Sequence, residues 1–189
     1  MLLFLGRIQP LKGADLAVDA LAALEAFPDA FLVVAGGPSG PSGEEEVARI
    51  RDQAGHAGLD GRVFWYPPQP HELVSTFCRA ADVCLVPSRT ESFGLVALEA
   101  AACGVPVVAS AVDGLRRLVR HGDTGLLVTE RSASAFAAAV TTLLADPAGA
   151  EAMGARAAAA AARFTWRAAA AGLEELHADL AARHLVECR

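Results

Sequence analysis

Short apolar runs that alternate with helix-like segments constrain the fold of this 189-residue chain more than any other feature. Each run is no more than six residues long, is rich in β-branched residues and is bounded by glycine, proline or a charged residue, as in strands buried on both faces of a sheet. The alternation predicts an α/β fold with a doubly wound, six-stranded parallel sheet and right-handed crossovers. The predicted strands are residues 2–6, 31–36, 62–66, 82–87, 105–110 and 124–128, with helices at about 14–26, 44–57, 70–80, 93–103 and 114–120.

The last third of the chain is a helical tail rich in alanine. Helices are expected at about 132–145 and 147–163, and Pro147 ends the first and starts the second. A last helix should begin near Thr165, a plausible N-cap.

The last helix carries one apolar stripe, because its apolar residues recur at alternating spacings of three and four. Packing on the chain's own sheet is the simpler expectation. The alternative is that the helix docks on an N-terminal domain outside this chain. In that case the sequence consists of a Rossmann-like domain at 1–163 and a C-terminal helix at 164–189. The stripe consists of Trp166, Ala169, Leu173, Leu176 and Leu180.

Composition excludes several classes of function. A net charge of −6 and the absence of a Lys/Arg cluster argue against nucleic acid as a partner. The apolar stretches fall short of the ~20 residues that a membrane helix needs, and the N-terminus does not resemble a signal peptide. The four cysteines, Cys78, Cys84, Cys103 and Cys188, lack C-x-x-C spacing, which indicates reduced thiols in a cytoplasmic protein.

No metal site is expected from the sequence. It has no D-x-D, and no histidine pairs with a cysteine or a carboxylate at ligand spacing. All five histidines are therefore interpreted as structural or surface residues. They are His56, His71, His121, His177 and His184.

The loop after the first predicted strand, GRIQPLKGAD, combines a turn with two cations. In open α/β sheets, ligands bind outside the carboxyl ends of the strands, where helix N-termini attract anions. Gly6 lets the chain turn, and Arg7 and Lys12 offer a guanidinium and an ammonium that suit a diphosphate. Two solvated surface charges would be the alternative if this loop stood alone.

The loop after the fourth strand, PSRTESFGLVALE, sets two carboxylates on either side of an expected helix start at Phe93. Glu91 precedes this start and Glu99 lies two turns into the helix, roughly 12 Å further along its axis. Carboxylates accept hydrogen bonds from vicinal diols, so one acid could serve each end of a sugar nucleotide. Alternatively, Glu91 only favours the helix dipole and Glu99 is solvated.

Other loops show no recognisable motif. GGPSGPSGEEE at 36–46 lacks G-x-G-x-x-G, has prolines in place of amide donors and carries three acids, so a flexible surface loop is expected. No P-loop and no G-x-S-x-G elbow occur.

Taken together, GRIQPLKG and ESFGLVALEAAACGVPVVAS resemble the C-terminal, donor-binding half of family 4 retaining GT-B glycosyltransferases. The resemblance implies that the chain binds a nucleotide-sugar donor, such as a UDP-sugar, without a metal or other cofactor. It implies that Arg7 and Lys12 contact the diphosphate, that Glu91 contacts the sugar and that Glu99 contacts the ribose. Backbone near Gln69 would contact the base. Sugar and phosphate would also contact the loop of Gly6 and the stretch Ser92, Phe93, Gly94 and Leu95.

The resemblance also implies limits. Such enzymes are thought to let the diphosphate leave on the face that the acceptor attacks. Most of the acceptor site belongs to an N-terminal half, so this chain alone is expected to bind donor weakly and turn over little. Family members commonly have V-G-G-L where this sequence has VDGL, and the role of Asp113 stays open.

Two alternatives to this interpretation remain. A dinucleotide-binding domain of a dehydrogenase would need a glycine-rich turn after the first strand, and GRIQPLKG lacks its second and third glycines. A noncatalytic interaction domain could share the scaffold, but it would be free to lose Arg7, Lys12, Glu91 and Glu99.

Overall fold

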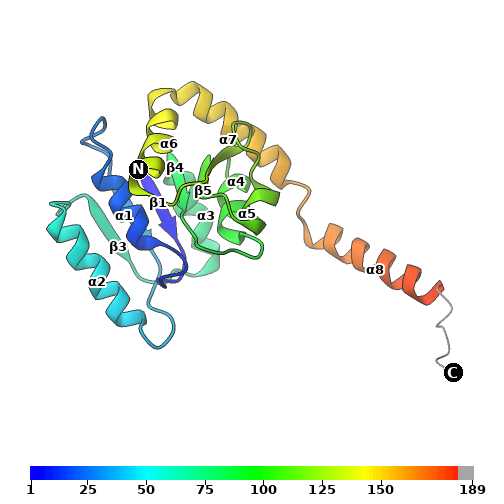
Figure 1. Ribbon diagram of the computed structural model, residues 1–189. Helices are drawn as coiled ribbons and strands as arrows, with labels where there is room; N and C mark the ends of the chain where they lie inside the picture. Colours follow the sequence, from blue (N-terminus) through cyan, green and yellow to red (C-terminus); the bar gives the residue numbers. More distant parts are fainter. Residues whose placement is uncertain (183–189) are drawn as a thin grey trace.

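The computed structural model describes residues 1–182 and contains one parallel sheet with helices on its two faces (Figure 1). The six strands lie in the order β3-β2-β1-β4-β5-β6, and every pairing is parallel. This confirms the predicted fold class. The strands are β1 Leu2–Leu5, β2 Leu32–Ala35, β3 Val63–Tyr66, β4 Val83–Val86, β5 Val107–Ser110 and β6 Gly125–Val128. The helices are α1 Ala14–Ala22, α2 Gly43–His56, α3 His71–Ala80, α4 Leu95–Ala102, α5 Asp113–Leu118, α6 Ala133–Ala145, α7 Pro147–Ala161 and α8 Trp166–Ala182.

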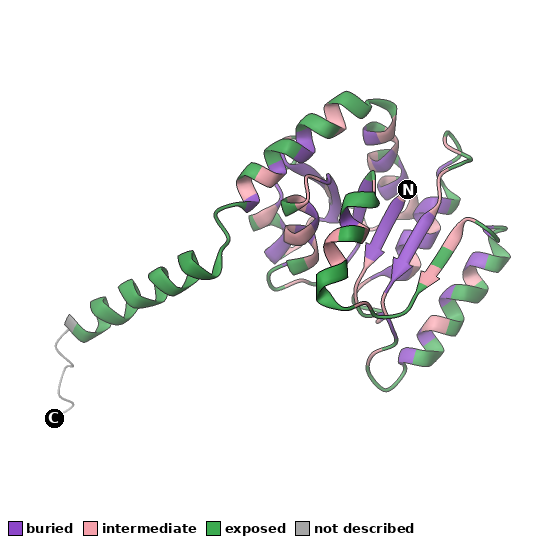
Figure 2. Ribbon diagram, turned by 180° about the vertical axis from the view of Figure 1, so that it is seen from behind, coloured by how far each residue is buried: buried purple, intermediate pink, exposed green. Residues whose placement is uncertain are grey.

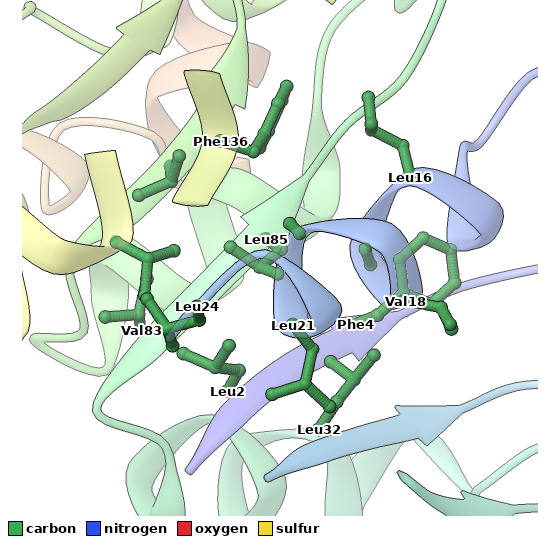
Figure 3. Close-up of a cluster of buried hydrophobic side chains, with 14 of the residues drawn as sticks. Leu2, Phe4, Leu16, Val18, Leu21, Leu24, Leu32, Val83, Leu85 and Phe136 are labelled. Carbon is green, nitrogen blue, oxygen red and sulfur yellow. The ribbon is translucent and has the colours of Figure 1, made fainter. Parts of the chain in front are cut away.

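Except in β3, alternate residues of the strands are buried in two separate cores. Leu2 and Phe4 of β1 belong to the core under α1, α2 and α6, whereas Leu3 belongs to the core under α3, α4 and α5. Figure 3 shows the first core, where Phe136 of α6 is fully buried near the central strands. A strand buried on both faces must be apolar throughout, which is why these strands read as continuous apolar runs.

Strand β3 differs from the other strands and corrects one expectation. Its residues alternate between partly buried and exposed, and Phe64 and Tyr66 remain 44% and 45% exposed. The prediction that every strand is buried on both faces is therefore wrong for β3. The reason is its place at an edge that helices cover less than α6 and α7 cover β6 at the other edge, so that Phe64 and Tyr66 meet the rings of Phe31 and Phe77 edge-on but stay partly exposed.

The ends of the C-terminal helices follow the capping signals in the sequence. The Ser132 hydroxyl accepts a hydrogen bond from the Ala135 amide at the start of α6. The Asp146 carboxylate does the same for the start of α7, where Pro147 takes the first helical position. Thr165 accepts from the Ala168 amide at the start of α8, as predicted.

Helix α8 projects away from the body formed by the sheet and the other helices (Figures 1 and 2). Its apolar stripe is open to solvent: Trp166 is 93% exposed and Leu173 is 67% exposed. The expectation that this stripe packs on the chain's own sheet is wrong, because the helices that precede α8 already lie against both faces of the sheet. His184 and Cys188 lie outside the described residues.

The strand order creates a switch point between β1 and β4. The chain leaves β1 in one direction to form β2 and β3, and later returns on the other side of β1 to form β4, β5 and β6. In such sheets a crevice opens at the carboxyl ends of the strands on either side of the switch. The loops that carry Lys12 and Glu91 follow β1 and β4, so the topology brings them to this crevice.

Candidate functional site

Lys12 and Glu91 meet at the switch point. The Nζ atom of Lys12 lies 2.6 Å from Oε2 of Glu91, and the two side chains are only 26% and 15% exposed. They come from loops 79 residues apart in sequence. One predicted cation and one predicted acid therefore share a single partly buried position.

The turn between Lys12 and α1 packs against backbone and against a partly buried arginine. Gly13 has φ 77°, and a Cβ there would lie 2.3 Å from the Pro87 carbonyl oxygen and 2.8 Å from Nη2 of Arg131. Only glycine fits this left-handed, crowded position. Arg131 follows β6, so three loops of the sheet meet under Lys12.

Arg131 was not anticipated from the sequence, since no motif marks the loop after the last strand. Its Nη2 lies 3.7 Å from the Asp15 carboxylate, and within residues 1–182 its Nε and Nη2 have no hydrogen-bond partner. Burial, followed by the nearby charge of Arg89, lowers the pKa of Arg131, while Asp15 opposes the shift. Arg131 thus places a partly buried positive charge beside the turn that carries Lys12.

Gly6 and Arg7 follow β1 directly. Arg7 is exposed and, in the described part of the chain, makes no hydrogen bond or ion pair. The neighbouring Ile8 amide donates to the Gly37 carbonyl in the loop after β2. That loop is thus paired at its start, and the expectation of a flexible surface loop over 36–46 is wrong there.

The loop after β4 differs in detail from its prediction. Helix α4 begins at Leu95, with Gly94 as N-cap at φ 97°, so Phe93 is not part of the helix and Glu99 lies only one turn into it. A Cβ on Gly94 would lie 2.7 Å from Cδ2 of Leu115, which fixes α5 against this loop. The amides of the first helical turn have no partner within the helix and are available to a ligand.

Helix α5 also supports the backbone of Glu91. The Gly114 amide donates to the Glu91 carbonyl oxygen at 2.9 Å, and the preceding Asp113 is exposed at the start of α5. This hydrogen bond holds Glu91 in place from the loop after β5. The glycine of VDGL is the signal for this contact that can be read along the chain.

Ser92 and Phe93 lie on the outer side of the same loop. The two are exposed, and the Phe93 ring meets Phe164 edge-to-face at 5.9 Å between centroids. Leu95, the first residue of α4, is 63% exposed. The rim of the site is therefore apolar on this side.

Glu99 lies beside His71, a pairing that the spacing of residues in the sequence did not indicate. Nδ1 of His71 is 3.8 Å from Oε1 of Glu99, although His71 itself is 84% exposed. Burial raises the pKa of Glu99, and the charge of His71 opposes this shift. The two residues come from α3 and α4, and only the tertiary fold brings them together.

Gln69 lies just before His71, in the loop after β3. Its side-chain amide donates to the Pro67 carbonyl at 2.7 Å and so folds back onto its own loop. A hollow of about 270 Å³, lined among others by Gly37, Trp65 and Pro67, opens at the carboxyl ends of β2 and β3. The predicted residues thus form two groups. Lys12 and Glu91 make up the first, and Glu99 lies apart from them, beside the loop of Gln69.

The other titratable residues offer little further chemistry. Burial raises the pKa of Cys78 to about 12, so its thiol stays protonated. His56 and His121 are surface residues that bond to nearby backbone, and His177 is exposed on α8. Over residues 1–182, no group of three or more His, Cys, Asp or Glu side chains is arranged to hold a metal ion. The helices of this part of the chain also include none with the length and apolar character to cross a membrane.

Comparison with known proteins defines the class to which this fold and site belong. The family model for glycosyl transferases group 1 matches residues 1–160. The chain therefore belongs to the glycosyl transferase group 1 family, which confirms the resemblance to glycosyltransferases seen in the loop motifs.

Among curated proteins, the chain is similar to enzymes named D-inositol 3-phosphate glycosyltransferase. It is 45% identical over 184 residues to the one from Thermobispora bispora, covering 95% of this chain and 43% of that protein. It is 44% identical over 188 residues to the one from Corynebacterium glutamicum, covering 97% and 44%. The stretches GRIQPLKG, GGPSG and PPQPHELV already indicated this likeness. The chain spans less than half the length of these relatives.

Solved structures agree on the fold. HepE from Anabaena, in complex with UDP and glucose, superposes with a TM-score of 0.87 at 27% identity, over 94% of this chain and 48% of that one. Sucrose-phosphate synthase from Thermosynechococcus elongatus gives 0.86 at 38% identity, over 97% and 46%.

Proposed function

We propose that this chain is the donor-binding half of a retaining glycosyltransferase and that it binds a UDP-sugar in the switch-point crevice. The observation that carries the proposal is the contact of Lys12 with Glu91, because it puts a phosphate ligand and a hydroxyl ligand side by side where α/β sheets bind nucleotides. The complexes of HepE with UDP and with UDP-glucose support the donor class.

In this proposal each group has a role that suits its chemistry. Arg7 and Lys12 bind the diphosphate, and the amides of Phe93, Gly94 and Leu95 face phosphate and sugar. Glu91 accepts hydrogen bonds from sugar hydroxyls. Glu99 accepts them from the ribose diol, and the backbone near Gln69 and the adjacent hollow receive the base.

Catalysis in this proposal is electrostatic. As the bond between sugar and diphosphate breaks, negative charge grows on the departing phosphate while the sugar becomes oxocarbenium-like. The cations Arg7 and Lys12 stabilise that charge, and Arg131 adds a partly buried positive charge beside the turn of Lys12. The chemistry asks for no metal. An acceptor that arrives on the face from which the diphosphate leaves then gives retention of configuration.

The acceptor belongs to the part of the proposal that lies outside this chain. The curated relatives are about twice as long, and we assign most of the acceptor site, for a small acceptor, to their N-terminal half. This chain alone should therefore bind donor weakly and transfer little sugar. A cytoplasmic location is part of the same proposal and is supported by the free thiols of Cys78, Cys84 and Cys103.

Calorimetric titration of the full chain with UDP, ADP, GDP and NAD tests the nucleotide class. We expect UDP to bind best, with a gain of affinity when a sugar is attached. A clear preference for NAD would favour the dehydrogenase alternative, and binding of none of the four would favour a noncatalytic interaction domain. Sustained sugar transfer by this chain alone would contradict the assignment of the acceptor site to another half.

Helix α8 is proposed to dock its apolar stripe on that N-terminal half. Trp166, Leu173, Leu176 and Leu180 are each more than half exposed, a pattern typical of an unfilled interface. The test is association with a separately produced N-terminal half of a curated relative. Replacing Leu173 and Leu176 by serine should weaken association, and serine at Ala170 and Ala171 is the control. Equal association of all variants would exclude the stripe.

A further inference from the structure

Lys12 and Glu91 neutralise each other across the two loops of the site. Their charged atoms lie 2.6 Å apart, and within residues 1–182 neither side chain has another charged partner. Each group therefore depends on the other for its hydrogen bond. A ligand that binds Lys12 breaks this ion pair and leaves the Glu91 carboxylate without its hydrogen-bond donor.

The two partners are not equally mobile. The Glu91 carbonyl is held by the Gly114 amide, and the side chain is 15% exposed, so the carboxylate has little room to turn away. Lys12 has a flexible four-carbon stem and can reorient. When the pair opens, Lys12 moves and the carboxylate stays.

A nucleoside diphosphate meets an obstacle at this pair. This step rests on the proposed function, in which Lys12 binds the diphosphate and Glu91 binds sugar hydroxyls. A diphosphate without sugar would draw Lys12 away and leave the carboxylate without a donor, close to a phosphate of like charge. Such a ligand binds at the expense of the ion pair.

A nucleoside diphosphate-sugar avoids this obstacle, because its hydroxyls can replace Lys12 as donors to Glu91. We infer that the Lys12–Glu91 ion pair makes the site select an intact nucleoside diphosphate-sugar over the nucleoside diphosphate that remains after transfer. Once the sugar is gone, Glu91 recaptures Lys12 and the diphosphate product is released more readily.

The test is calorimetric binding of UDP and of UDP-glucose to the full chain and to Glu91→Gln. Glutamine keeps the shape but releases Lys12, so UDP should bind about three- to tenfold tighter, as expected for a partly exposed ion pair. UDP-glucose should bind no more tightly than to the unchanged chain. Glu151→Gln, an exposed residue of α7, makes the same charge change and should alter neither affinity by more than about twofold.

A second background separates the ion pair from simple repulsion between Glu91 and phosphate. In Lys12→Met, Glu91→Gln should tighten UDP binding by less than about twofold. An undiminished gain in that background would overturn the inference, because repulsion alone would then explain it.

The unfolding temperature of each variant is measured as a control, to check that the variant folds. If Glu91→Gln does not fold, Glu91→Asp, which withdraws the carboxylate, should shift the preference in the same direction. An unchanged ratio of UDP to UDP-glucose affinity in a folded Glu91 variant overturns this inference and leaves the proposed donor site intact. If the unchanged chain binds neither ligand, the proposed function and this inference fail together.

Discussion

Apolar residues are buried in the body, which consists of the sheet with helices α1 to α7, and exposed in the projecting helix α8. In the former, Phe136 and the central strands are fully buried between helices of the same chain. In α8, every residue whose side chain is described is exposed, and Trp166 is 93% exposed (Figure 2). The two regions have similarly apolar stripes, so hydrophobic patterning alone does not tell which stripe finds its partner within the chain.

This difference indicates that the folding stability and the proposed donor binding depend on the body and not on α8. The body can bury its apolar surface without help, and it also carries the candidate site. Helix α8 contributes helical structure but almost no burial, so changes to it should leave the body unaffected. Matched substitutions in the two regions test this division, from the largest expected effect to the smallest.

The largest contrast is between two aromatic side chains. Phe136→Ala should lower the free energy of unfolding by about 3–5 kcal/mol, because it leaves a cavity in a close-packed core. Trp166→Ala should change it by less than about 0.5 kcal/mol, as at other exposed sites. Urea unfolding followed by circular dichroism measures both changes. A comparable loss for Trp166→Ala would mean that α8 packs on the body in solution.

Two glycines give the next contrast. Gly13→Ala should lower the free energy of unfolding by about 2–4 kcal/mol, because alanine is strained at φ 77° and its Cβ meets the Pro87 carbonyl. Gly172→Ala lies inside α8 and should only add helical signal, since alanine favours helices by ~1 kcal/mol. The same unfolding experiment measures both variants. If Gly13→Ala is as harmless as Gly172→Ala, the loops do not meet as tightly as described.

Binding supplies the third contrast, between two cations. Lys12→Ala should weaken UDP binding by ~1.5–3 kcal/mol, the range for a hydrogen bond to a charged group, and keep the fold intact. Arg167→Ala on α8 removes the same charge and should leave binding unchanged. Calorimetric titration gives the two affinities. Equal affinities for the two variants would remove Lys12 from the site.

The smallest contrast concerns pH. Burial raises the pKa of Glu99, so as pH rises the unfolded chain loses this proton first, and stability falls across that interval and stays lower above it. Glu99→Gln should therefore raise the unfolding temperature by about 1–2 °C at pH 7 and by less at pH 4. Glu174→Gln on the exposed α8 should show no such difference. A stabilisation of Glu99→Gln that grows toward low pH would contradict this sign.

The elements of the body could be predicted because their signals are local. A strand buried on both faces must be apolar throughout, and Ser132 and Asp146 cap their helices through nearby amides. The boundaries of α4 and the exposure of β3 could not be predicted. They depend on Leu115 beneath Gly94 and on the position of β3 at the edge of the sheet.

The candidate site divides in the same way. Arg7, Lys12, Glu91 and Glu99 could be named from the sequence, because charged residues in the loops after strands, or in the helix that follows, stand out against apolar runs. Arg131 and His71 could not be named, because the first lies beside the turn at Gly13 and the second beside Glu99 only through the fold. The roles of these residues in donor binding stay predictions, and no such role is proposed for His71.

The sequence by itself determined the α/β class, the order of elements and the loops in which polar chemistry is concentrated, because these follow from the pattern of short-range preferences along the chain. Only the tertiary structure decided which distant side chains share a position and which apolar face is left without a partner. Pairing 79 residues apart, as between Lys12 and Glu91, depends on the order in which strands lie side by side. That order is fixed by the packing of the whole body and by no single segment.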